Sequence, residues 1–454
     1  MGKALKSVHI TNYYHKNSGG ISTSYNNLLA AAGRRGRFVS LIVPGEKEEV
    51  EIVNDFAKIY YVPAMQSPVF DKRYRIIMPW QYLPVDTLIR KILMDEMPDI
   101  IEITDKYSLS LFGAMIRLKK FKQLNRPMTV HFSCERLDDN IASFLSKGKA
   151  AKWFARRLMG NYNFPSFDFH IANSAYTARE FYESVEEKFN PRRSKAFLNF
   201  CWRFFNSPQV PIQERIFVCP RGVDNETFNP NRRSDEIKRE MRKRAGVPEN
   251  SIVLLYAGRI SPEKNIELLP KMMEILSKDA RKDFRLLVAG AGPQSDWLRE
   301  ETGKRFPDKI VQLGHLDKKT LADYYANADI FVHPNPREPF GIAPLEAMAS
   351  GSPTLAPNAG GILSYATNEN AWLVAPDAES FAEAVREIVE NPQLREEKTI
   401  KAVQTARENT WEKSTNRLLD TYDKAYEDFR RRHELYVLPE KPKDFDFAKE
   451  LLQD

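Results

Sequence analysis

The sequence has little cysteine and no long apolar run, and each shortage excludes a class of protein. Cys134, Cys201 and Cys219 are the three cysteines in 454 residues, too few and too scattered for a disulfide framework or a zinc site. The longest apolar runs, such as Ile252–Ala257, fall far short of the ~20 residues of a transmembrane helix, and the first residues lack the apolar block of a signal peptide. We therefore expect a cytoplasmic protein without a membrane-spanning segment.

The chain also lacks a large excess of one charge. Lysine and arginine number 68 and aspartate and glutamate 61, so the net charge is +7, with 28% charged and 42% hydrophobic residues. These values are typical of a globular protein and exclude collagen and extended disorder. The small basic excess leaves a nucleic-acid binder open as an alternative, but no recognition motif accompanies it. We therefore expect no nucleic-acid partner.

What the chain does contain is a regular alternation of short β-branched runs with amphipathic stretches of helical period. This alternation is typical of parallel sheets with crossover helices. The runs fall into two series. The first series comprises residues 7–11, 38–43, 58–62, 99–103, 129–132, 169–173 and 215–219. The second comprises residues 252–257, 285–289, 309–312, 329–332, 353–356 and 371–374.

A polar, turn-rich stretch from Pro220 to Arg233 separates the two series, so we place the interdomain linker there. The predicted domains are residues 1–224 and 225–410, and the helix and tail of residues 411–454 are expected to pack back on the first domain. The predicted fold class is α/β, with two doubly wound Rossmann-like domains facing across a cleft. Ligands of such folds bind at the carboxyl ends of the strands.

Two glutamates stand on either side of a predicted helix start. Glu338 follows the strand predicted at residues 329–332, and Glu346 lies eight positions later, beyond the turn at Gly341. The N–H groups of a helix start attract anions, so a diphosphate fits between two carboxylates that accept hydrogen bonds from sugar hydroxyls. The alternative to a binding site is that Glu338 is a charged loop residue and Glu346 a solvated helix residue, without a ligand.

Two cations follow the first strand of the second series. Arg259 is held at the strand end, and Lys264 lies beyond Ser261, a predicted N-cap, and Pro262, the predicted first helical residue. Such cations neutralise a diphosphate and stabilise the charge that grows on it when a bond to it breaks. Because the helix dipole disfavours a lysine at a helix start, Lys264 indicates an anionic partner.

Glycines follow two further predicted strands. Gly19 and Gly20 open the first predicted helix, and Gly290-Ala291-Gly292 follows the strand at residues 285–289. Each glycine pair allows a close approach of the backbone to a ligand, with a plain tight turn as the alternative. The dinucleotide-binding pattern G-x-G-x-x-G is absent.

Taken in order, these motifs carry a resemblance that spans about Val8 to Leu419. The motifs are Gly19-Gly20, Pro220-Arg221-Gly222-Val223-Asp224, Gly258-Arg259 with Glu263-Lys264-Asn265, Gly290-Ala291-Gly292-Pro293, and Glu338-Pro339-Phe340-Gly341 followed by Leu345-Glu346-Ala347-Met348-Ala349. The ordered set resembles glycosyltransferase family 4. The resemblance implies the GT-B fold and a retaining enzyme that takes a hexosyl group from a nucleotide sugar.

The resemblance also implies a role for each matching position. Arg259 and Lys264 match the pair that grips the donor diphosphate. Glu346 matches the glutamate that holds the nucleotide ribose, and Glu338 the glutamate beside the donor sugar. The remaining expected donor contacts, mostly through backbone, are Gly19, Gly20, Gly290, Phe340, Gly341, Ile342 and Ala343. The resemblance also implies that no metal or other cofactor is required. An Asp-x-Asp pair does occur at Asp444 and Asp446, but it lies in a charged tail and is interpreted as solvated.

One stretch departs from the family pattern. Ser133 to Asp138 resembles a Ser-His-Glu-Arg-Leu-Asp stretch of mannosyltransferase-like members, in which the histidine faces the donor sugar, but this chain has Cys134 there. His131 lies three residues earlier, on the opposite face of a regular strand. A core histidine and a donor contact are both open for His131. The same stretch is the basis for GDP-mannose as the donor, with a UDP-sugar as the alternative.

Two basic segments lie in the expected acceptor domain. Residues 141–160 contain five cations and no acid, and residues 188–205 mix cations with aromatic residues. The apolar residues at helical spacing in the first segment are Phe144, Ala151, Ala155, Leu158 and Met159. They predict either a core-facing side or peripheral contact with an anionic membrane. The second interpretation implies a lipid-linked acceptor and a location at the inner face of the cytoplasmic membrane.

We therefore expect a metal-independent hexosyltransferase that acts on a nucleoside-diphosphate sugar and on a glycan or lipid-linked acceptor. Because a fold does not fix a reaction, a sugar-nucleotide epimerase or hydrolase is an open alternative. A weakly active family member is another, because of Cys134.

Overall fold

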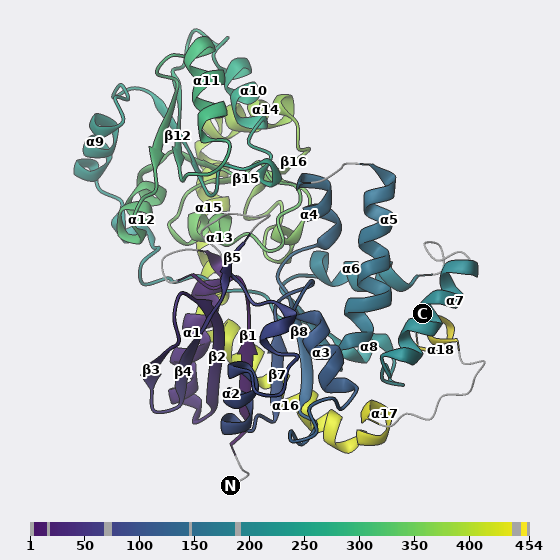
Figure 1. The fold of residues 1–454 in the computed structure, drawn as a ribbon. Helices are drawn as coiled ribbons and strands as arrows, with labels where there is room; N and C mark the ends of the chain where they lie inside the picture. Colours follow the sequence, from purple (N-terminus) through teal and green to yellow (C-terminus); the bar gives the residue numbers. More distant parts are fainter. Residues whose placement is uncertain are drawn as a thin grey trace. The chain divides into compact units, whose positions relative to one another are not determined.

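The computed structural model describes residues 4–15, 19–67, 75–144, 148–186, 192–437 and 446–451. The chain divides into two compact units (Figure 1). The first unit comprises residues 1–220 and 414–454, and the second comprises residues 221–413. Within the described ranges, no helix combines the length and the apolar character needed to cross a bilayer.

An eight-stranded sheet forms the centre of the first unit, in the order β10-β9-β8-β7-β1-β2-β4-β3. The strands are β1 Lys6–Ile10, β2 Phe38–Gly45, β3 Glu49–Asn54, β4 Ala57–Pro63, β7 Ile100–Ile103, β8 Met128–Ser133, β9 Phe169–Ala172 and β10 Ile216–Val218. All pairs are parallel except β3 with β4. A separate pair, β5 Met65–Gln66 and β6 Arg75–Ile76, is antiparallel.

Helices cover both faces of this sheet (Figure 1). The helices of the unit are α1 Gly20–Arg35, α2 Leu88–Glu96, α3 Ser110–Arg117, α4 Leu137–Phe144, α5 Lys149–Leu158, α6 Ala175–Val185, α7 Arg192–Phe204, α8 Ile212–Arg215, α16 Trp411–Arg431, α17 His433–Val437 and α18 Phe447–Leu451. Of these, α5, α7 and α18 pack mainly on other helices. The central strands form because their runs are mostly apolar and are buried on both faces, as in Ile100–Ile103, where Glu102 is the polar exception.

The C-terminal helix α16 packs on the first sheet through apolar residues such as Leu419 and Phe429. A buried polar group adds to this contact. Glu102 on β7 accepts hydrogen bonds from His9 Nδ1 (3.0 Å), Tyr25 Oη (2.9 Å) and the hydroxyl of Tyr422 on α16. Burial opposes ionisation of Glu102, but His9 and the hydroxyl donors outweigh it and lower the pKa of this carboxyl.

The second unit contains a six-stranded parallel sheet in the order β13-β12-β11-β14-β15-β16. The strands are β11 Ile252–Ala257, β12 Phe284–Ala289, β13 Ile310–Gly314, β14 Ile330–Val332, β15 Thr354–Pro357 and β16 Trp372–Val374. The order proceeds from β11 through β12 to β13 on one side and from β14 outward on the other. The switch point of the sheet therefore lies between β11 and β14.

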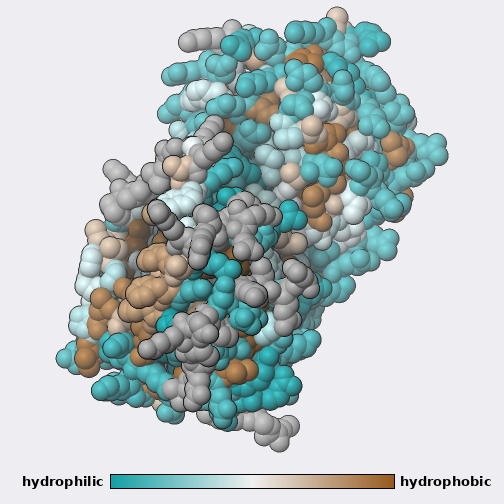
Figure 2. All heavy atoms as spheres, turned by 90° about the vertical axis from the view of Figure 1, so that its right-hand side faces the viewer, coloured by the Kyte–Doolittle hydropathy of each residue, from teal (hydrophilic) through white to brown (hydrophobic). Residues whose placement is uncertain are grey.

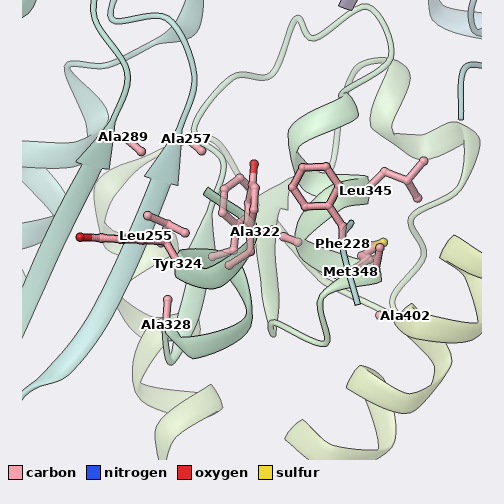
Figure 3. Packing of buried hydrophobic residues seen from close by; sticks show 14 of the residues in the cluster. Phe228, Leu255, Ala257, Ala289, Ala322, Tyr324, Ala328, Leu345, Met348 and Ala402 are labelled. Carbon is pink, nitrogen blue, oxygen red and sulfur yellow. The ribbon is translucent and has the colours of Figure 1, made fainter. Parts of the chain in front are cut away.

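Two layers of helices enclose this sheet. One apolar cluster includes α10 Leu268–Leu276, α11 Ser295–Arg305 and α14 Ala378–Glu390; the other includes α9 Asp235–Arg244, α12 Lys318–Asn327, α13 Ile342–Ala349 and α15 Pro392–Glu408. Leu345 and Met348 on α13 pack beside Phe228, and Ala402 of α15 lies next to them (Figure 3). Helix α13 also contacts β15, the neighbour of β14 in the sheet.

Candidate active site

The residues predicted to hold a diphosphate follow the two strands at the switch point of the second sheet. Arg259 and Lys264 follow β11, and Glu338 follows β14, which is the neighbour of β11 in a parallel register with Leu254 opposite Ile330. The carboxyl ends of adjacent parallel strands meet at one edge of a sheet, so these loops lie together. This is the usual ligand position in doubly wound folds.

Lys264 and Glu338 form the central ion pair of the site. Lys264 Nζ lies 2.8 Å from Glu338 Oε2, and Asn335 Nδ2 donates to the same oxygen at 3.0 Å. His333 Nε2 lies 3.5 Å from it. Burial alone would raise the pKa of Glu338, but Lys264, His333 and the hydrogen bonds lower it to about 2. Glu338 is therefore a carboxylate at any physiological pH.

His333 is the neutral member of this group. It is the first residue after β14 and is 4% exposed. Burial lowers the pKa of His333 to about 4, although Glu338 partly offsets this effect. The positive charge beside Glu338 at neutral pH is therefore carried by Lys264.

The loop after β11 differs from its predicted form. Pro262–Lys264 is a three-residue 3-10 turn that ends at Asn265 in the left-handed region, and α10 begins later, at Leu268. The Ser261 hydroxyl donates to Glu263 Oε1 (2.5 Å) instead of capping the turn. The predicted positions of Ser261 and Pro262 at the start of a helical turn are confirmed, but the turn is 3-10 and spans only three residues, so the dipole of a long helix does not act on Lys264. Its anionic partner in the chain itself is Glu338.

Helix α13 begins beside Glu338 with Gly341 as its N-cap at φ +86°. Within the described chain no side chain caps its first turn, so N–H groups of this turn are available to an anion. Ile342 and Ala343 are half-buried there. The Phe340 side chain is buried, and the centroid of its ring lies 5.2 Å from that of the Tyr365 ring. Only the backbone of Phe340 is therefore suited to contact a ligand.

Glu346 lies on α13 in an environment opposite to that of Glu338. The Tyr325 hydroxyl donates to Glu346 Oε2 at 3.2 Å. Burial raises the pKa of Glu346 to about 7, and the Tyr325 hydrogen bond and Lys318 only partly offset this effect. The two glutamates of the motif therefore have pKa values on opposite sides of the ordinary value of a carboxyl.

Two glycine pairs let the backbones of this site approach one another. A Cβ on Gly290 would lie 1.9 Å from the carbonyl oxygen of Gly258, and one on Gly292 would lie 2.3 Å from that of Ile260. The fold itself therefore requires a glycine at position 290, because the loop of Gly290 packs directly on the loop of Arg259. Gly361 plays the same part on the other side, because its N–H donates to the carbonyl of Glu338 at 2.6 Å.

Replacing Gly290 by alanine is therefore expected to lower the free energy of unfolding of the protein by about 3 kcal/mol, since the new methyl group overlaps backbone and φ is +138°. The matched control is Gly303→Ala in α11, where nothing lies within 4 Å of the added Cβ. That change should be neutral or stabilising by about 0.5–1 kcal/mol. Urea denaturation followed by circular dichroism measures both; equal losses would contradict the close packing of the two loops.

The other predicted site residues lie in the first unit. Gly19, at φ +96°, is the N-cap of α1, and both it and Gly20 are exposed. Cys134 follows β8 and is half-buried. His131 is fully buried on β8, with the rings of Phe167, Phe181 and His170 within 6 Å. Burial holds the pKa of His131 well below its usual value, and neither ring nitrogen has a partner among the described residues. His131 thus occupies a core position, without the hydrogen bond expected of a core histidine.

The charged stretch after Cys134 is used within the fold. Arg136 makes two hydrogen bonds to Asp138 (3.0 and 2.9 Å) and one to Glu183 (2.7 Å). Glu180 accepts from Lys106 Nζ at 2.5 Å and from the N–H of Leu137 at 2.6 Å. The loop therefore owes its shape to internal ion pairs. In the described part of the chain, no cluster of three or more His, Cys, Asp and Glu side chains is arranged to hold a metal ion.

Several residues of the site were not predicted from the sequence. They are Tyr325, His333, Asn335, Gly360, Gly361 and Tyr365. The Gly360-Gly361 pair follows β15, as Gly19-Gly20 follows β1, so the same glycine signal could have located it. The others are single residues of common types, and only the tertiary structure reveals their contacts.

Two family profiles match this chain. The profile described as "Glycosyl transferases group 1" matches residues 237–405, and the one described as "Glycosyltransferase Family 4" matches residues 18–188. Together they cover most of both units. The two doubly wound units and these matches define a GT-B glycosyltransferase. The chain belongs to glycosyltransferase family 4.

Sequence alignments with two relatives cover about nine-tenths of the chain. It is 28% identical to a GDP-mannose-dependent alpha-(1-6)-phosphatidylinositol dimannoside mannosyltransferase of Mycobacterium tuberculosis, over 92% of this chain and 96% of the relative. It is 25% identical to a GDP-mannose-dependent alpha-mannosyltransferase of Corynebacterium glutamicum, over 89% and 86%. The structure of Anabaena HepE in complex with UDP is similar, with a TM-score of 0.62, 16% identity and coverage of 92% and 100%.

Proposed function

We propose that this protein is a retaining, metal-independent hexosyltransferase that takes its sugar from a nucleoside diphosphate. The observation that carries the proposal is the Lys264–Glu338 ion pair at the switch point, beside the uncapped start of α13. A cation, a row of N–H groups and two glutamates of different pKa stand there together. This combination suits a diphosphate with a sugar at each end.

In the proposed reaction, an acceptor hydroxyl oxygen forms a bond to C1 of the hexosyl group, and the bond from C1 to the diphosphate oxygen breaks. The bonding electron pair leaves with the diphosphate, where Lys264, Arg259 and the first N–H groups of α13 stabilise the added charge. The acceptor proton passes to an oxygen of the departing phosphate. Glu338 holds the hydroxyls of the transferred hexose, and Glu346 holds those of the ribose.

GDP-mannose is the proposed donor, supported by the names of the two mannosyltransferase relatives. A UDP-sugar is the alternative, supported by the nucleotide in the Anabaena structure. A lipid-linked glycan is the proposed acceptor, because the mycobacterial relative is named for a phosphatidylinositol mannoside. We place the reaction at the inner face of the cytoplasmic membrane.

A thermal-shift screen of the full chain with GDP-mannose, UDP-glucose and ADP-glucose, in the presence of EDTA, tests the proposal. One nucleotide sugar should raise the melting temperature by several degrees, and the same compound should be consumed with transfer to a glycolipid extract. Absence of any shift would contradict the donor site. Equal release of free sugar or of an epimer without acceptor would instead identify a hydrolase or an epimerase.

A further inference from the structure

Helix α7 exposes a row of aromatic rings on its outer face. Phe197, Phe200 and Phe204 are 54%, 61% and 60% exposed. Their spacing of three and four residues places them on one line of the helix. The ring centroids of neighbours in the row are 6.2 and 6.3 Å apart. Three adjacent exposed phenylalanines are uncommon on a soluble surface and mark an interaction site.

The opposite face of α7 already has its packing partners. Leu198, Cys201 and Trp202 are buried, and Trp202 Nε1 donates to the carbonyl of Gly160 at 2.7 Å. This contact anchors α7 beyond the end of α5. The outer row is therefore a second apolar face, which the folding of the first unit does not require.

Helix α5 adds two large exposed rings to the same part of the unit. Trp153 and Phe154 are both 55% exposed. By contrast, Ala155 and Met159, which the helical spacing suggested for a membrane-facing side, are fully buried. Of the two interpretations left open for these residues, the core-facing one is confirmed. The exposed rings one and two positions before Ala155 were missed.

The charge around these rings identifies the class of partner. Helices α5 and α7 together contain eight lysines and arginines and no aspartate or glutamate. Lys195 Nζ lies 2.9 Å from a carboxylate oxygen of Asp446. Asp446 was predicted to be solvated and instead forms this ion pair. Asp444, the other residue of the Asp-x-Asp pair, lies outside the described residues. Lys152 is exposed, next to Trp153. A second copy of this face would bring equal cations against these, so self-association through it is disfavoured.

We propose that the outer faces of α5 and α7 dock on an anionic lipid bilayer, with Phe197, Phe200 and Phe204 entering the acyl region. Apolar rings on two helices whose own charged residues are all basic satisfy both conditions for interfacial binding: burial of apolar area and attraction to anionic headgroups. Figure 2 looks onto the side of the first unit where α7 lies, and apolar side chains gather on that face among hydrophilic ones. The proposal goes beyond the proposed reaction, since docking requires neither donor nor acceptor.

Co-sedimentation of the full chain with sucrose-loaded vesicles tests this docking. Vesicles of equal parts phosphatidylglycerol and phosphatidylcholine should bind the protein, and phosphatidylcholine alone should bind it at least about tenfold more weakly. Changing the three phenylalanines of the row to serine should lower the partition coefficient on the anionic vesicles by at least about tenfold. Lys152→Gln should lower it about fivefold.

The matched control is the double change Val50→Ser and Ile52→Ser on the edge strand β3, where the side chains are 50% and 69% exposed. It removes exposed apolar area from the same unit and should leave vesicle binding unchanged. All variants must keep the melting temperature and the nucleotide-induced shift of the parent, which separates lost docking from a lost donor site. Equal binding by the triple variant, no binding by the parent, or a parent dimer that the triple change dissociates would each overturn the proposal. Retention by single-stranded RNA in place of vesicles would overturn it as well.

Discussion

Replacing Lys264 by alanine is expected to weaken the binding of GDP and UDP about 10²-fold while leaving the affinity for the free nucleosides unchanged. Two effects combine. The variant loses a charged hydrogen bond to phosphate, and Glu338 loses the cation 2.8 Å away that neutralises its charge next to an anionic ligand. Isothermal titration calorimetry with each diphosphate and its nucleoside measures the difference.

The control for this change is Lys271→Ala. Lys271 lies on the neighbouring helix α10, is exposed, and has no hydrogen bond or ion pair within the described residues. Its removal should change diphosphate affinity less than twofold. A Lys264→Ala protein that binds GDP and UDP as well as the parent would show that the diphosphate lies elsewhere. A parallel loss of nucleoside binding would indicate general damage to the site.

Nucleotide affinity is expected to rise about tenfold between pH 6 and pH 8, because Glu346 has a pKa of about 7. A carboxyl with this pKa is about one-tenth ionised at pH 6 and about nine-tenths ionised at pH 8. Only the ionised form accepts hydrogen bonds from both hydroxyls of a ribose. Binding near neutral pH should therefore release a proton, which calorimetry in buffers of different ionisation enthalpy detects.

In the protein without ligand, ionisation of Glu346 with rising pH has the opposite effect: it lowers the free energy of unfolding. Its pKa in the folded chain is raised above the unfolded value, so its contribution to the free energy of unfolding is complete below about pH 4 and is lost as the pH rises through about 7. Glu346→Gln should remove both dependences: the variant binds weakly at all pH values, and its stability no longer falls over this range. A tenfold rise of affinity that persists in Glu346→Gln would assign the titration to another group.

The two parallel sheets were predictable because each central strand is a short apolar run between helical stretches. Strand β3 was missed for a physical reason. It is an antiparallel edge strand with Val50 and Ile52 exposed, so it lacks the buried run that marks its neighbours. The pair β5 and β6 is too short to leave any periodic signal.

The site itself was only partly predictable. Arg259, Lys264, Glu338 and Glu346 stand at predicted strand ends or on the helix that follows, so local pattern made them candidates, and the family resemblance gave each its expected role. Their environment depends on contacts between residues far apart in sequence, such as the 74 positions between Lys264 and Glu338. No local pattern distinguishes a carboxyl with a pKa of about 2 from one with a pKa of about 7.

Helix α5 shows a different limit. It has apolar residues on two faces, Ala155 toward the core and Trp153 toward solvent. Helical spacing identifies each line of residues but does not say which line is buried, because that depends on the neighbours the chain supplies. The segment was therefore recognised as amphipathic, but the choice between core and membrane for its apolar line needed the structure, and the exposed line at Trp153 was missed.

A crystal structure of the full chain with GDP or UDP bound is the most direct test of the donor site. The diphosphate is expected within hydrogen-bond distance of Lys264 Nζ, the Arg259 guanidinium and the first N–H groups of α13, with the ribose hydroxyls on Glu346. A nucleotide bound away from the carboxyl ends of β11 and β14, with the Lys264–Glu338 pair unchanged, would contradict the account.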